Sequence, residues 1–210
     1  MLERAALKAN NTHMANANSP FGLRYIGLSG GAVSNSALQE RRNAILYSNA
    51  TAIFTGDLVK MQNTGYLAQW TAATAVSQCW GVFAGCRYYS NSQQTVVPQK
   101  YWPGADAASG TVLAQFYPAA LSPTPLFVIQ TDATGITLAD IGANADIAVG
   151  TGSTTTGFSG SYLDTGTLGT TATNTSRAAV PMLAHRAVPT PVVLAGDTAR
   201  HRGPSHPSST

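Results

Sequence analysis

Short apolar runs recur along the middle of the chain, separated by glycine, proline, aspartate and asparagine. Four of them are GYLAQW at 65–70, TVLAQFY at 111–117, LFVIQTD at 126–132 and ADIAVG at 145–150. β-Branched and aromatic residues in runs of this length, with turn residues every ~8–12 positions, are typical of a sandwich or barrel. The pattern predicts an all-β fold, with a single β-sandwich or barrel-like domain over residues 51–176.

The run SQCWGVFAGCRYY at 77–89 is apolar at almost every position. It fits one strand buried on both faces, or two strands bent at Gly81 or Gly85. Trp80 lies inside the run and is predicted to be a core residue. Cys79 and Cys86 would point to opposite faces of one strand, so we interpret them as small buried hydrophobes; pairing would need a turn or bulge.

The segment that precedes this body differs from it in composition. Residues 1–13 are predicted to be an unstructured extension, the alternative being a genuine N-terminal arm, and residues 14–50 an extended arm and loop. SALQERRNAILY at 36–47 could form two helical turns capped by Ser36, but its surroundings favour an extended segment that wraps the domain.

The Thr- and Gly-rich stretch 151–176 predicts long surface loops with a strand or two, held to the core by a few large apolar side chains, among them Phe158 and Leu163. Residues 177–210 carry five prolines and three of the four histidines. They predict a disordered or aberrant tail, of the kind that a shifted reading frame produces.

Charge is scarce, at 10% of residues against ~25% in a typical soluble domain. Residues 14–176 hold six bases and seven acids, a balance of −1, whereas 177–210 hold four bases and one acid, a balance of +3. A body without clustered bases predicts no specific nucleic-acid partner. The chain has no apolar run of ~18 residues and no apolar signal core near its start, which predicts no membrane span and synthesis in the cytoplasm.

Candidate catalytic residues are few. All four histidines, at 13, 185, 201 and 206, lie outside the predicted body, so a Ser-His-Asp triad or a Cys-His pair has no base there. Aspartates beside glycine are interpreted as turn caps, and Asp132, Asp140 and Asp146 do not have the spacing of a calcium loop. The sequence therefore predicts a protein that is not an enzyme, with no cofactor and no metal.

Three segments suggest a family: MANANSPFGLRYIG at 14–27, YWPGADAASGTVLAQFY at 101–117 and ADIGANADIAVGTGSTTTGFSGSYLD at 139–164. Together they resemble the head decoration or cement proteins of tailed bacteriophages. The resemblance implies a virion protein on the capsid exterior that binds the major capsid protein, bridges neighbouring subunits and forms a homo-oligomer, with a trimer favoured.

The residues expected to contact the capsid or a second subunit come from the arm and from exposed turns: Phe21, Arg24, Arg41, Arg42, Tyr101, Trp102 and Phe158. Tyr101 and Trp102 are interpreted as a turn that anchors either a loop or a partner. The alternatives are a minor virion protein of the neck or a head fibre, a glycan- or receptor-binding module that uses an aromatic platform, and a cell-wall hydrolase.

Overall fold

The structure is a computed structural model that describes residues 19–29, 37–71, 78–119, 124–132, 136–137, 140, 143 and 145–168. The predictions for residues 1–13, for Ser36 as a helix cap and for 177–210 lie outside these residues. No α-helix occurs within them, and the predicted all-β class is confirmed. The arrangement is sandwich-like and built from antiparallel sheets.

The strands, in chain order, are β1 Arg24–Leu28, β2 Gln39–Arg42, β3 Ile53–Phe54, β4 Leu58–Met61, β5 Leu67–Gln69, β6 Cys79–Ser90, β7 Thr95–Gln99, β8 Tyr101–Trp102, β9 Leu113–Pro118, β10 Pro125–Val128, β11 Asp146–Ala148 and β12 Tyr162–Asp164. A short 3₁₀ turn, η4 (Thr165–Thr167), follows β12. Each of the four apolar runs contributes one strand, namely β5, β9, β10 and β11.

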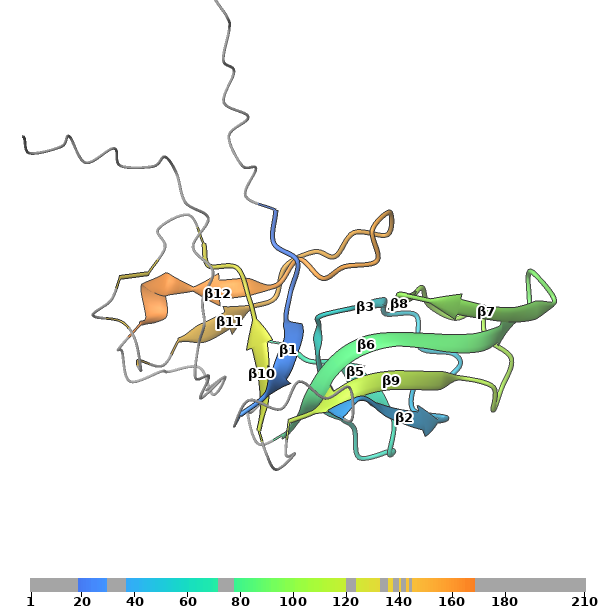
Figure 1. Cartoon of the computed structure of the whole chain (residues 1–210). Helices are drawn as coiled ribbons and strands as arrows, with labels where there is room; N and C mark the ends of the chain where they lie inside the picture. Colours follow the sequence, from blue (N-terminus) through green and yellow to red (C-terminus); the bar gives the residue numbers. More distant parts are fainter. Residues whose placement is uncertain are drawn as a thin grey trace, which may run out of the picture.

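Strand β6 organises the largest sheet, whose order is β2-β9-β6-β4-β5 with β7 added beside β6. β9 runs along one edge of β6, while β4 and β7 share the other edge, where Leu58 faces Val82 and Val97 faces Tyr88. The long apolar run is therefore a single bulged strand. Figure 1 shows β2, β9 and β6 side by side.

Trp80 is 45% exposed, so its prediction as a core residue is wrong. Trp80 lies at a bulge in the pairing with β4, between Gly81 opposite Val59 and Cys79 opposite Lys60, and has no opposed residue there. An apolar run does not show where a bulge will interrupt the pairing. Cys86 is buried, as predicted, whereas Cys79 is half-buried, and both thiols are free.

The segment 36–47 was predicted to be extended, with two helical turns as the alternative. Its described residues, from 37 onward, form no α-helix. Gln39–Arg42 pairs with β9, Gln39 opposite Phe116 and Arg42 opposite Leu113. Likewise β1 pairs with β10, Arg24 opposite Val128. The stretch predicted as an arm thus contributes β1 and β2. Pairing with β10 and β9 satisfies the hydrogen-bonding groups of its backbone.

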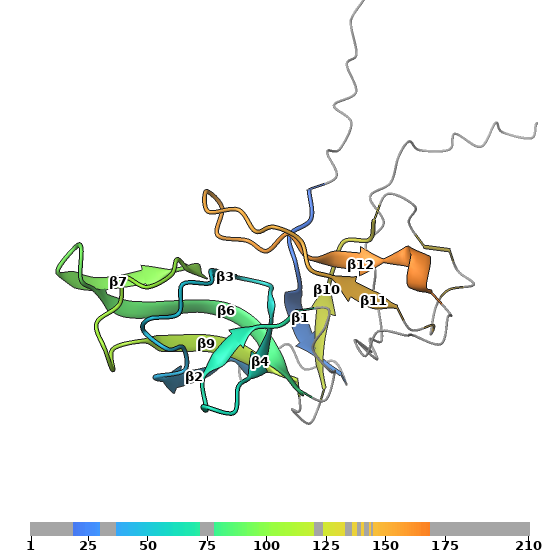
Figure 2. The same cartoon turned by 180° about the vertical axis from the view of Figure 1, so that it is seen from behind.

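Two hydrophobic clusters lie on opposite sides of β6. The first fills the space between the large sheet and the short β3–β8 ribbon, and its largest members are Trp102, Phe83, Phe116, Tyr88, Ile45 and Ile53. The second joins the large sheet to the β1–β10 and β11–β12 ribbons through Leu23, Val82, Ile129, Ala145, Ile147 and Leu163. Both views place these ribbons at one end of the molecule and the large sheet at the other (Figures 1 and 2).

The connection between β11 and β12, residues 149–161, extends back over the β3–β8 ribbon (Figures 1 and 2). A parallel bridge between Thr55 and Phe158 holds it there. The Thr- and Gly-rich segment is thus a surface loop attached to the body, as far as residue 168, and Leu163 is fully buried.

Candidate interaction surface

Arg24, at the start of β1, lies between two phenylalanine rings. Its guanidinium carbon is 4.7 Å from the ring centroid of Phe21 and 4.6 Å from that of Phe158. The ammonium of Lys100 lies 5.3 Å from the Phe158 centroid. Arg24 and Lys100 are exposed and both rings are half-buried. We call these four residues the cation–aromatic patch; such contacts contribute about 0.5–1 kcal/mol each at exposed sites.

A tight backbone crossing positions the two rings. The amide of Gly22 donates to the carbonyl of Ser161 at 3.1 Å, and the amide of Leu23 donates to the carbonyl of Gly56 at 3.0 Å. Gly22 has φ +71°, and a Cβ at this position would lie 2.5 Å from Cβ of Ser159. Only glycine fits that approach without strain, so the crossing depends on it.

The buried carboxylate of Asp57 lies at the centre of the same crossing. Its side chain is 1% exposed and accepts hydrogen bonds from the Phe54 amide at 2.8 Å, Gln69 Nε2 at 3.0 Å and Ser159 Oγ at 2.5 Å. Ser161 Oγ lies 2.9 Å from Ser159 Oγ. Burial raises the pKa of the Asp57 carboxyl, and the hydrogen bonds offset only part of that rise.

The cation–aromatic patch carries an uncompensated positive charge within the described part of the chain. There, neither Arg24 nor Lys100 forms an ion pair with a carboxylate; the pair that the structure shows joins Arg87 to Glu40. The aromatic rings hold the Arg24 guanidinium in place without neutralising it. A cation that is already held in position loses less conformational freedom when it binds an acidic group.

Tyr101 and Trp102 do not act as one unit, because neighbouring residues of a strand point to opposite faces. The Tyr101 ring is half-buried and stacks on Phe54, with centroids 5.2 Å apart. Trp102 is fully buried, and its Nε1 donates to the carbonyl of Asn49 at 2.9 Å. Trp102 therefore anchors a loop; its prediction as a surface contact is wrong, because no part of its side chain reaches the surface.

Arg41 and Arg42 also separate across β2. Arg41 is half-buried, and its Nη1 donates to the sulfur of Met61 at 3.5 Å. Arg42 is exposed on the opposite face and lines a groove together with Arg87. Of the seven predicted contact residues, the structure brings three together in the patch, namely Phe21, Arg24 and Phe158.

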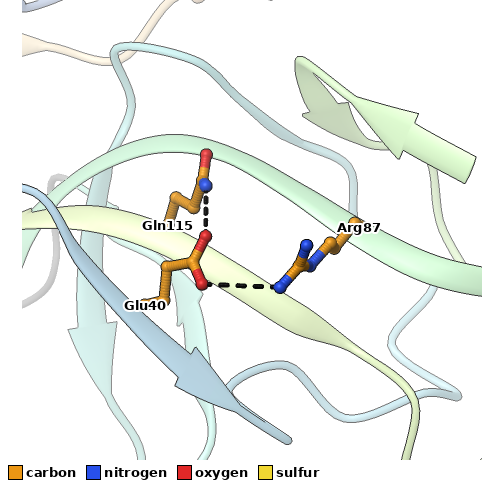
Figure 3. A network of polar contacts seen from close by, with 3 residues as sticks. All are labelled: Glu40, Arg87 and Gln115. Atoms are coloured by element: carbon orange, nitrogen blue, oxygen red, sulfur yellow. Dashed lines mark hydrogen bonds and ion pairs between the residues drawn. The ribbon is translucent and has the colours of Figure 1, made fainter.

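A second polar group occupies the outer face of the large sheet. Arg87 Nη2 on β6 lies 3.6 Å from Glu40 Oε2 on β2, and Gln115 Nε2 on β9 donates to the other Glu40 oxygen at 2.5 Å. Figure 3 shows the three side chains converging from their three strands. The sequence contains no sign of this group, because only the register of the strands places these residues side by side.

Asp140 and Asp164 cap turns, as predicted. Asp140 accepts from the Thr137 amide at 2.8 Å, and Asp164 accepts from the Gly166 amide at 3.0 Å. Asp132 does not cap a turn: it accepts from the Thr165 amide at 3.0 Å, 33 residues along the chain. In the same residues, no three His, Cys, Asp or Glu side chains gather closely enough to hold a metal ion. No helix among them is long and apolar enough to cross a membrane.

No protein-family model, no curated protein and no solved structure matches the chain.

Proposed function

We propose that the chain is a decoration or cement protein of a tailed-bacteriophage head, which binds the outside of the capsid and bridges neighbouring major capsid subunits. The sequence resemblance over residues 14–176 suggests this role. The structural observation that supports it best is the cation–aromatic patch, in which three of the expected contact residues form one surface together with Lys100.

The patch has the composition of a protein-binding surface. Aromatic residues, phenylalanine among them, and arginine are enriched in protein–protein interfaces relative to the rest of the surface. Two cations without carboxylate partners in the described residues fit an acidic partner surface, where each would form charge-assisted hydrogen bonds. The patch also joins three segments that are distant in the sequence, at residues 21–24, 100 and 158.

Repetition on a shell would strengthen a modest contact. A capsid presents many equivalent sites, and an oligomer that engages several of them at once gains avidity without any new contact. A homo-oligomer, with a trimer favoured, belongs to this proposal, because closed symmetry suits the threefold positions of a shell. The mass of the purified protein in solution tests this part.

The test is binding of the purified full chain to mature heads and to unexpanded precursor shells of the encoding phage. Copy number is measured by quantitative gel density and cryo-electron microscopy. We expect hundreds of copies on mature heads and few on precursors. About a dozen copies would identify a neck or fibre protein instead, and the absence of binding would refute a virion role.

A double variant, Arg24→Gln with Lys100→Gln, tests the patch. We expect its affinity for heads to fall at least about tenfold per lost charged hydrogen bond. Arg87→Gln is the matched control for Arg24→Gln alone, because each removes one exposed cation and Arg87 lies on the other surface; the affinity of Arg87→Gln should stay at the wild-type value. Equal loss in both variants would point to general charge attraction and not to the patch.

A further inference from the structure

The register of the large sheet places two arginines on the same face, on either side of Leu113. Arg42 on β2 and Arg87 on β6 both stand opposite Leu113 on β9. Directly opposed residues in antiparallel strands project to the same side. Two positions along each strand, Glu40 stands opposite Gln115 on the same face, and Figure 3 shows the two converging with Arg87.

These arginines border a groove of about 410 Å³. Its walls come from β2, β6 and β9, from the start of β7 and from the loop before β9, and the side chains that matter here are Arg42, Arg87, Tyr89, Val96, Thr111 and Leu113. Val96 is 61% exposed, the most exposed of the large hydrophobic residues described. The volume lies within the range of small-molecule sites, about 300–1,000 Å³.

The charges of the groove suit a ligand with one negative charge. Arg42 and Arg87 contribute +2 and Glu40 contributes −1, which leaves +1. The Arg87–Glu40 pair joins atoms 3.6 Å apart in side chains that are 55% and 42% exposed, and such surface pairs are weak. Arg87 can therefore exchange Glu40 for a ligand. A guanidinium binds a planar carboxylate through two parallel hydrogen bonds, whereas Glu40 would oppose a doubly charged phosphate.

The surrounding surface favours a ring-shaped ligand over a peptide. An extended peptide gains affinity from backbone hydrogen bonds at a free strand edge. The floor of the groove is formed by β6 and β9, whose edges are both occupied by neighbouring strands, and the edges of β2 and β7 that are free among the described residues lie at its sides. The floor instead offers side chains: the half-buried Tyr89 ring lies two residues beyond Arg87 on β6, and Val96 on β7 stands opposite Tyr89, so the two form an apolar surface beside the arginines. Tyrosine faces pack well against the C–H face of a sugar ring.

We propose that this groove binds a carboxylated sugar, such as a uronic or sialic acid residue. The carboxylate is held by Arg42 and Arg87, and the ring lies against Tyr89 and Val96. The proposal does not depend on the capsid function, because it uses a different surface and no residue of the cation–aromatic patch.

The isotope-labelled full chain is titrated with methyl β-D-glucuronide, and binding is measured from the amide chemical shifts in NMR spectra. The matched control ligand is methyl β-D-glucoside, which lacks only the carboxylate. We expect saturable shifts in β2, β6 and β9 with the glucuronide alone. Arg42→Gln and Arg87→Gln should each weaken binding at least about tenfold, as loss of a charged hydrogen bond does. Lys100→Gln, which removes a cation from the patch, should bind like the wild type.

Three results would overturn the proposal. Equal affinity for the glucoside and the glucuronide would show that the carboxylate is not recognised. Unchanged binding in both arginine variants, whose spectra also report whether the fold is intact, would place the ligand elsewhere. Shifts at the groove with an acidic peptide such as acetyl-Gly-Glu-Gly-amide, but none with the glucuronide or with N-acetylneuraminate, would assign the groove to a peptide partner.

Discussion

Val82 and Phe83 are neighbours on β6, yet their side chains enter different hydrophobic clusters. Phe83 packs between the large sheet and the β3–β8 ribbon, whereas Val82 packs against the β1–β10 and β11–β12 ribbons. Both are almost fully buried. Because strand residues alternate between faces, a single strand is the shared wall of both clusters.

This arrangement predicts that the two clusters can be weakened separately. Phe83→Ala should lower the free energy of unfolding by about 3–5 kcal/mol and Val82→Ala by roughly 1–3 kcal/mol, because each removes buried apolar volume. Native-state hydrogen exchange should show the largest loss of protection in β4, β6 and β9 for Phe83→Ala, and in β1, β10 and β12 for Val82→Ala. A uniform loss in both variants would show that the clusters unfold together.

The buried carboxylate of Asp57 predicts a specific pH dependence. Burial raises the pKa of Asp57 above its ordinary value of 3.8, so the folded protein binds more protons than the unfolded chain between 3.8 and the raised value. Stability from this group is therefore greatest below 3.8 and falls as the pH rises through that window. Asp57→Asn should remove this slope in urea unfolding measured from pH 3 to 7.

The difference in unfolding free energy between the wild type and Asp57→Asn reports on Asp57 alone. Hydrogen bonds lower the pKa of Asp106 and of Asp140. The stability that these two carboxylates contribute to the fold is lost as the pH falls, a pH dependence opposite in sign to that of Asp57. They are present in both proteins and cancel in the difference. A difference in unfolding free energy that stays constant with pH would contradict the raised pKa of Asp57.

Gly22 is predicted to be far less replaceable than Gly65. Both have positive φ, at +71° and +82°, but a Cβ at Gly22 would meet Ser159 at 2.5 Å, whereas nothing lies within 4 Å at Gly65. Gly65→Ala should cost about 1–2 kcal/mol from backbone strain alone, and Gly22→Ala about 1–3 kcal/mol more from the clash. Thermal or urea unfolding measures both; equal losses would mean that the crossing relaxes without cost.

Tryptophan fluorescence should separate Trp80 from the other two tryptophans. Trp80 is 45% exposed, whereas Trp70 is 1% exposed and Trp102 is fully buried. Iodide should quench the emission of Trp80, which lies at longer wavelength than that of the buried tryptophans. Trp80→Phe should remove this quenchable component. If the quenchable component survived in Trp80→Phe, a buried tryptophan would have to be accessible to solvent.

The fold class could be predicted because its signals are local. Apolar runs bounded by turn residues encode strands wherever they lie, and four such runs became β5, β9, β10 and β11. Trp80 was assigned to the wrong environment, and for Trp102 the loop anchor is correct and the surface contact is not. A run shows which residues are apolar, but a bulge in the pairing with β4 leaves Trp80 without an opposed residue, and strand alternation buries Trp102 while Tyr101 stays half-buried.

The patch and the groove differ in how far they were predictable. Phe21, Arg24 and Phe158 were named as contacts from the sequence, but their meeting needs the backbone crossing at Gly22, and Lys100 was not expected there. In the groove, Arg42 was named and its partners Arg87 and Glu40 were not. Residues on different strands become neighbours only through register, for which a single sequence contains no direct signal.

The all-β class, the scarcity of charge and the turn caps at Asp140 and Asp164 follow from composition or from residues close together in the chain. That β6 separates two cores, that Arg24 lies between Phe21 and Phe158, and that Arg42 and Arg87 share one face follows from the folded arrangement alone. Those relationships depend on strand pairing across long sequence distances, where packing and backbone hydrogen bonding select one arrangement out of many that the local pattern allows.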